Sequence, residues 1–216
     1  MTSLSRRAFV TASAAALLTG CGGGHGTAPT TNSAAKQGSS GQGGSQPGSQ
    51  TSSARTGTKA VHALARSVPV TLRVPAIGVD TPVMQLGLAA DGTVQVPPIT
   101  AHDRAGWYRY SPTPGRTGPS VILGHVTVGA YGDGVFRHLA LLRVGERIDA
   151  VLENGTTATF TVTAVRTVAK ADFPSDEVYG NVDRPELRLI TCGGTRTGTG
   201  YLDNVIVFAA LTSASP

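Results

Sequence analysis

Two residues of this sequence have the chemistry and the setting of a catalytic pair. Cys192 follows the apolar run Arg188-Leu189-Ile190-Thr191 and precedes two glycines, and His125 follows Val121-Ile122-Leu123-Gly124. A cysteine attacks as its thiolate, of which an ordinary thiol has only a few per cent at neutral pH, so it needs a base or a cation beside it. A cysteine and a histidine that each follow an apolar strand therefore indicate nucleophilic catalysis. Taken singly, each has a plainer interpretation, as a buried cysteine or a structural histidine.

A metal centre is not indicated by the same residues. Three scattered histidines and one cysteine show none of the spacings of a zinc site, and nothing in the sequence points to a cofactor. The chain has 2 cysteines, Cys21 and Cys192. If Cys21 is modified, Cys192 is the one remaining thiol of the mature chain and cannot form an internal disulfide.

The elements that must position this pair are mostly β. Apolar content begins at Val68, and we expect one domain over residues 68–216. Alternating or short apolar runs predict six strands, and Asn154-Gly155 predicts a hairpin turn. The strands are expected at Val70–Val74, Val121–Leu123, Arg147–Leu152, Thr157–Val165, Leu187–Thr191 and Asn204–Ala209, with helical turns at Phe136–Leu142 and Ser175–Tyr179. Many short strands with few short helices indicate an all-β (mainly β) fold, a closed or nearly closed barrel.

The segment before the domain divides into a leader and a tether. Residues 1–20 predict an export signal, because Arg6-Arg7 precedes a short apolar stretch. Ser5-Arg6-Arg7-Ala8-Phe9-Val10 resembles the twin-arginine export motif, and Leu18-Thr19-Gly20-Cys21 resembles a lipobox that ends in a diacylated cysteine. Residues 21–67 are predicted to be a disordered tether rich in Gly, Ser, Thr and Gln. The alternative is a plain secretory signal with an incidental cysteine.

The basic character of the chain belongs to this leader and tether. The formal net charge is +5, but the domain from residue 68 carries 12 Lys and Arg against 13 Asp and Glu. A nearly neutral domain has no electrostatic footprint for nucleic acid. We therefore expect no nucleic-acid partner. The leader and the lipobox-like segment predict a location at the outer face of the cell membrane, where a lipid on Cys21 would anchor the protein.

The sequence resembles the sortases, and within them the actinobacterial class F group. Leu189-Ile190-Thr191-Cys192 is similar to the sortase cysteine signature, and Leu123-Gly124-His125 to the histidine motif. Further similar segments run in the same order: Arg73–Asp80, Gly106–Tyr108, Gly134–Phe136, Leu142–Glu146 and Asp203–Val207. The resemblance covers roughly residues 68–212, nearly the whole domain.

This resemblance implies an eight-stranded barrel and a cysteine transpeptidase. Cys192 would attack the Thr-Gly bond of a Leu-Pro-X-Thr-Gly-like sorting signal, and His125 would act as general acid and then base. The thioacyl-enzyme would pass its acyl group to an amine or to water. The implied partners are surface proteins with a C-terminal sorting signal and a peptidoglycan-type amine acceptor, and we expect a monomer. Thr191 and Trp107 are candidate substrate contacts, although a place in the core is the plainer interpretation of Trp107.

The sequence departs from the family at one catalytic position. Sortases carry an arginine at the start of the last strand, where this chain has Leu202. Arg196, in the preceding connection, is the candidate for a replacement donor to the substrate or oxyanion, and a solvated loop residue is the alternative. Arg188 shares the face of Cys192 but lies four residues away, about 13 Å along a strand.

Two other functions stay open on this sequence. One is a catalytically weak sortase-like lipoprotein that binds peptide or cell-wall ligands. The other is a generic lipoprotein whose barrel merely buries its cysteine, in which case Cys192 and His125 would lie far apart.

Overall fold

The structure, a computed structural model, describes residues 61–198 and 200–216, with the side chain of Ala130 left out. The predicted export signal, Cys21 and most of the predicted tether lie outside the described residues. None of the described helices is both long enough and apolar enough to cross a bilayer.

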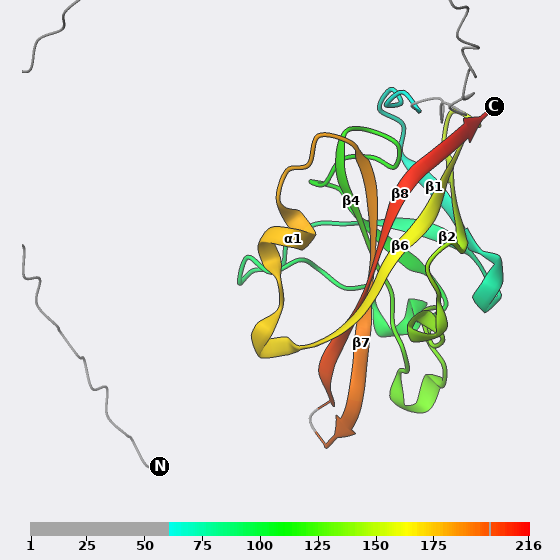
Figure 1. Ribbon diagram of the computed structural model, residues 1–216. Coiled ribbons are helices and arrows are strands. Elements are labelled where there is room, and N and C mark those ends of the chain that lie inside the picture. The colour runs from blue at the N-terminus through cyan, green and yellow to red at the C-terminus, as the bar shows by residue number, and fades with distance from the viewer. Residues whose placement is uncertain (1–60, 199) are drawn as a thin grey trace, which may run out of the picture. The chain divides into compact units, whose positions relative to one another are not determined.

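Eight strands form one closed barrel, as predicted from the sequence (Figure 1). In order around the barrel they are β1, β2, β3, β4, β7, β8, β6 and β5, and β5 pairs with β1 to close it. Their bounds are Pro69–Val74 (β1), Val79–Leu86 (β2), Ala105–Tyr108 (β3), Gly118–Leu123 (β4), Arg147–Leu152 (β5), Thr157–Ala169 (β6), Pro185–Thr197 (β7) and Gly200–Ser215 (β8). Two pairs, β2 with β3 and β4 with β7, are parallel, and the other pairs are antiparallel.

Two strands of this barrel had no sequence signal. β2 contains Pro82, which masks its alternation, and β3 is only four residues long and contains Gly106. Both are held by their neighbours, since β3 pairs with β2 on one side and β4 on the other. Strands of this kind are recognisable only in the assembled sheet.

The helices are few and short, as expected. The predicted turn at Ser175–Tyr179 is the one α-helix among the described residues, α1, which lies beside β4 in the β6–β7 connection (Figure 1). The turn predicted over Phe136–Leu142 is narrower, a 3-10 helix (η4) at Leu139–Leu141. The other 3-10 helices are η1 (Pro75–Ile77), η2 (Ile99–Ala101), η3 (Gly129–Tyr131) and η5 (Lys170–Asp172).

The barrel interior is a continuous apolar core. Trp107, Phe136 and Phe160 are its largest fully buried side chains. The Trp107 indole is 1% exposed and donates a hydrogen bond from Nε1 to the carbonyl of Pro112 (3.2 Å). The indole is therefore a core residue, and the proposed substrate contact by Trp107 is not supported by its position.

A second apolar cluster lies on the outer face of β4, β7 and β8, under α1. It is formed by Val121, Val178, Ile190, Ile206 and Phe208. Because side chains of a strand alternate between its two faces, this cluster identifies the outward-facing positions of the three strands. That assignment decides where the catalytic candidates point.

Ion pairs fasten α1 and its connection to this outer face. Arg166 on β6 pairs with Glu177 of α1 and lowers the pKa of that carboxyl by a hydrogen bond. Arg188 on β7 is 3% exposed, pairs with Glu186, and donates to the Glu177 carbonyl (3.3 Å). Arg188 therefore serves the packing of the connection.

The folded part reaches back before residue 68. The Leu64 amide donates to the Gly115 carbonyl (2.8 Å), and its side chain packs against the barrel core. Ser67 is buried and accepts a hydrogen bond from the Asn154 amide. Residues 64–67, assigned to the tether by composition, thus contact the domain.

Candidate active site

The parallel register of β4 and β7 aligns His125 with Cys192. Leu123 pairs with Ile190, and the Gly124 amide donates to the Ile190 carbonyl (3.1 Å). His125 follows Leu123 by two residues and Cys192 follows Ile190 by two residues, so the two occupy corresponding positions. Neighbouring strands of a sheet lie about 4.8 Å apart, so the two residues are neighbours. This register is inconsistent with the alternative of a generic lipoprotein, in which Cys192 and His125 would lie far apart.

Cys192 belongs to the outer face of β7, because Ile190, two residues before it on the strand, packs in the outer cluster. His125 lies two residues beyond the end of β4. Cys192 is partly exposed and is a free thiol, and His125 is also partly exposed. A partly exposed thiol beside a partly exposed imidazole can act as nucleophile and base.

Cys192 does not end its strand, contrary to the sequence expectation. β7 continues for five residues beyond it and forms a long hairpin with β8, which reaches the lower end of the domain in Figure 1. Gly193 and Gly194 lie inside this hairpin. A Cβ on Gly193 would meet Val205 Cγ2 at 2.6 Å, and Gly194 has φ +71 with the Asp203 carboxylate over its α-carbon. The glycines are therefore needed for close packing in the hairpin and do not make a turn.

His125 is oriented by a backbone carbonyl. Its Nε2 lies 2.6 Å from the carbonyl oxygen of Pro97, in the β2–β3 connection. Because a carbonyl can only accept, Nε2 carries the proton in this contact. Nδ1 is then the nitrogen left to take a proton from the thiol or from an amine.

The segment after His125 folds back on itself and is tied to β8. The Phe136 amide donates to the His125 carbonyl (2.8 Å), and the hydroxyls of Thr127 and Tyr201 are hydrogen-bonded at 2.6 Å. These contacts connect the His125 segment to the strand beside β7. They hold the backbone that carries His125 beside β8.

Gly134 leaves room for the His125 backbone. A Cβ at this position would overlap the His125 carbonyl oxygen and lie 2.5 Å from its carbon. Since backbone atoms cannot move aside cheaply, we expect Gly134→Ala to displace His125 and to lower the free energy of unfolding by about 1–3 kcal/mol. Denaturant unfolding measures the loss, and the His125 ring resonances in NMR spectra should shift.

Gly198→Ala is the matched control for this variant. A Cβ added at Gly198 would have no atom within 4 Å, and the backbone there has no positive φ. The variant should leave both the stability and the His125 resonances unchanged. Equal behaviour of the two variants would refute the role given to Gly134.

No arginine takes the position that Leu202 occupies. Leu202 lies two residues from Asn204 on β8, is 53% exposed, and shares the outer face. Arg196 pairs with Tyr201 beyond a bulge in the hairpin and is exposed. Arg188 is committed to Glu186. The role proposed for Arg196 therefore stays a prediction.

Thr191 is buried next to Cys192 on β7. It is 4% exposed, and its Oγ1 is buried without a hydrogen-bond partner among the described residues. It lines a cavity of about 290 Å³ at the barrel end together with Cys192, Arg137 and Tyr201. Arg137 is paired with Asp133 there (2.9 Å). Substrate contact by Thr191 stays a prediction.

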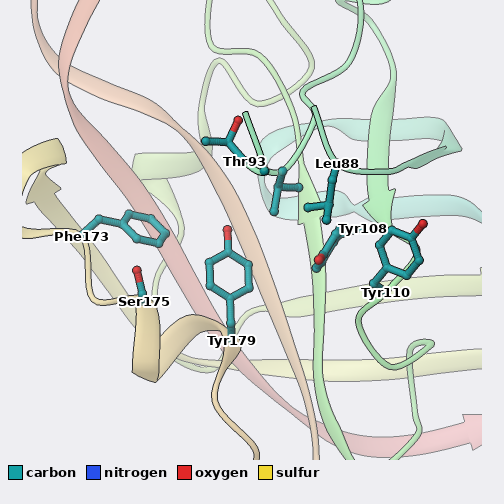
Figure 2. A pocket seen from close by; sticks show the side chains of 9 residues that line it. Leu88, Thr93, Tyr108, Tyr110, Phe173, Ser175 and Tyr179 are labelled. Carbon is teal, nitrogen blue, oxygen red and sulfur yellow. The ribbon is translucent and has the colours of Figure 1, made fainter. Parts of the chain in front are cut away.

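A larger hollow, the aromatic groove, lies on the outer face between the β2–β3 and β6–β7 connections (Figure 2). It has a volume of about 540 Å³ and is lined by Leu88, Gly92, Thr93, Val94, Tyr108, Tyr110, Phe173, Ser175 and Tyr179. Burial raises the pKa of Tyr179, and Tyr108 adds to the rise, so its phenol stays neutral. Of the adjacent aromatic residues Trp107 and Tyr108, Trp107 is buried in the core, whereas Tyr108 lines the groove and can contact a ligand.

The groove residues of the β6–β7 connection had no functional signal in the sequence. Phe173 precedes α1 and Tyr179 is its last residue, and the two come together with Tyr108 only because α1 packs over β4. Within the described part of the chain, no three His, Cys, Asp or Glu side chains are grouped so that they could hold a metal ion.

Comparisons with known proteins identify one family. A family model described as the sortase domain matches residues 72–212. The fold is similar to that of a lid mutant of sortase A from Corynebacterium diphtheriae, with TM-score 0.55, 20% identity and coverage of 71% of this chain and 74% of that one. The sortase SrtA from Actinomyces oris has a TM-score of 0.52 and 25% identity, with coverage of 74% of this chain and 89% of that one. Sortase C-1 from Actinomyces oris has a TM-score of 0.53 and 21% identity, with coverage of 67% of this chain and 75% of that one. A search of the curated proteins gave no match.

Proposed function

Because the chain belongs to the sortase family of cysteine transpeptidases, we propose that it is a class F sortase acting on a Leu-Pro-X-Thr-Gly-like sorting signal. The observation that carries the proposal is the register that aligns His125 with Cys192 on adjacent strands. The collinear segments from Arg73 to Val207 support the class F assignment.

The proposed reaction has two stages. The Cys192 thiolate attacks the threonine carbonyl of the signal, and the tetrahedral intermediate expels the glycine amine, which takes a proton from His125. An incoming amine, or water, then attacks the thioester and gives a proton to His125, and Cys192 leaves as thiolate. The protein needs no cofactor for either stage.

The aromatic groove supports a peptide substrate. Trp107 on β3 pairs with Ile122 on the antiparallel strand β4, so the next residue of β3, Tyr108, lies at the level of Val121. Because Tyr108 lines the groove, the groove begins near this level. From Val121 to His125 the strand rises about 13 Å. An extended peptide with its threonine carbonyl at Cys192 would place its leucine, three residues earlier, about 10 Å away, at the apolar end of the groove.

The proposal includes a location outside the cell. The twin-arginine-like leader and the lipobox at Cys21 support export and lipid anchoring at the outer face of the membrane. The composition of the tether supports a flexible spacer between anchor and domain. The partners would be surface proteins carrying the signal and a peptidoglycan-type amine, with the enzyme as a monomer.

A second function is favoured by one observation. Leu202 occupies the position of the family's arginine, which favours a catalytically weak sortase-like lipoprotein that binds signals or cell-wall material. A receptor would use the same aromatic groove and would release its ligand uncleaved.

One experiment separates the two functions. The purified chain is incubated with a Leu-Pro-X-Thr-Gly peptide, with and without an added amine, and analysed by intact-protein mass spectrometry. For an enzyme we expect a thioester adduct on Cys192 of the mass of the Leu-Pro-X-Thr part, equimolar release of the glycine fragment, and an amide product when amine is present. Saturable peptide binding with no adduct and no cleavage would instead establish the receptor.

A further inference from the structure

We propose that Asn204 is the missing third group of the site, a carboxamide that donates to the carbonyl oxygen of the substrate at Cys192. The inference rests on the proposed function and concerns the position that the sequence left open. The Leu202 side chain has no polar atom and cannot donate a hydrogen bond. Asn204, on the same strand β8, would donate it instead.

The antiparallel register of β7 and β8 carries the proposal. Cys192 and Asn204 are direct partners, and the pairing is regular from Glu186 with Ala210 to Gly193 with Asp203. Residues directly opposite each other in an antiparallel pair have Cβ atoms about 4.5–5.5 Å apart. The Asn204 side chain therefore starts next to the thiol.

The face of Asn204 is that of Cys192. Ile206, two residues on, and Ile190, two residues before Cys192, are direct partners and pack together in the outer cluster. Alternation then turns both Cys192 and Asn204 outward. Since β4, β7 and β8 are consecutive in the barrel, Cys192 lies between His125 on one side and Asn204 on the other.

The Asn204 amide is available to a ligand. It is partly exposed, and its side chain forms no hydrogen bond within residues 61–198 and 200–216. The nearby guanidinium groups are otherwise placed: Arg188 is buried against Glu186, Arg137 pairs with Asp133, and Arg196 lies beyond the bulge.

The chemistry requires a donor at this point. When the thiolate adds to the carbonyl, a carbon–sulfur bond forms and the carbonyl π electrons move to oxygen. The NH₂ of Asn204 then stabilises the oxyanion without transferring a proton. The oxyanion collapses, the carbon–nitrogen bond breaks, and the amine takes its proton from His125. Removing one such donor typically costs about 10²–10³ in kcat.

The test compares Asn204→Ala and Asn204→Asp with the unaltered chain in the peptide assay. Asn204→Asp keeps the shape but replaces the donor by a carboxylate. For both variants we expect kcat for thioester formation to fall by about 10²-fold or more while KM changes little, because the donor acts on the developing charge. Asn181→Ala, in the exposed α1–β7 connection, is the matched control and should behave as the unaltered chain.

A second variant separates this role from a structural one. Leu202→Arg combined with Asn204→Ala restores a donor to the same face of β8, and we expect it to recover most of the lost kcat. Thermal unfolding checks that each variant is folded. Asn204→Ala activity within twofold of the unaltered chain, or no recovery in the double variant, would overturn the proposal. If the unaltered chain itself forms no thioester, the proposed function fails, and the inference fails with it.

Discussion

Replacing Cys192 by alanine is expected to abolish cleavage and transfer while leaving peptide binding intact. The thiol is partly exposed, so its removal opens no core cavity, and the aromatic groove is built by other residues. Loss of the nucleophile should lower kcat by more than about 10³-fold, because the proposed reaction passes through a thioester on this thiol. Chromatography of the peptide products measures turnover, and fluorescence anisotropy of a labelled peptide measures binding.

Cys192→Ser is the companion variant, since its hydroxyl keeps the size but is a far weaker nucleophile at neutral pH. It should bind the peptide as tightly as the alanine variant and accumulate no thioester. Turnover by Cys192→Ala above the level of the buffer would show that the reaction does not pass through this residue.

Replacing His125 is expected to have the next largest effect. Without a proton donor for the leaving amine and a base for the incoming one, kcat should fall by about 10²–10⁴-fold. His125→Gln is the informative variant because its amide can still donate to the Pro97 carbonyl that holds the imidazole. It should match His125→Ala in lost activity but retain more stability.

His138→Ala is the control, since His138 is exposed and is the N-cap of the 3-10 helix Leu139–Leu141. It should leave the rate unchanged. If His125→Gln kept more than a tenth of the activity, the imidazole would act only by orienting the site, and proton transfer would have to be assigned elsewhere.

Much of the fold follows from local pattern. Alternation over Val70–Val74 and Thr157–Val165, and the Asn154-Gly155 dipeptide between β5 and β6, lie where the structure has strands and a hairpin. Periodicity reports burial along one strand, so it finds strands that are regular. It misses β2 and β3, whose pairing depends on neighbours distant in the sequence.

The chemical candidates can be read from the amino-acid sequence alone. The residue types and apolar settings of Cys192 and His125, and the motifs around them, indicate a nucleophile and an acid–base group on a barrel. The resemblance to the sortases places Leu202 where that family carries an arginine. These conclusions depend on local sequence, which the chain carries without folding.

The neighbours of these groups follow from how the strands pair in the folded barrel. The parallel register of β4 and β7 brings His125 beside Cys192, and the antiparallel register of β7 and β8 brings Asn204 to the other side of Cys192. The Trp107 side chain is buried in the core. Alternation tells which face a side chain occupies but not which strand lies next to it. That is fixed by how the strands pair around the closed barrel, a non-local property that appears only when the whole core packs.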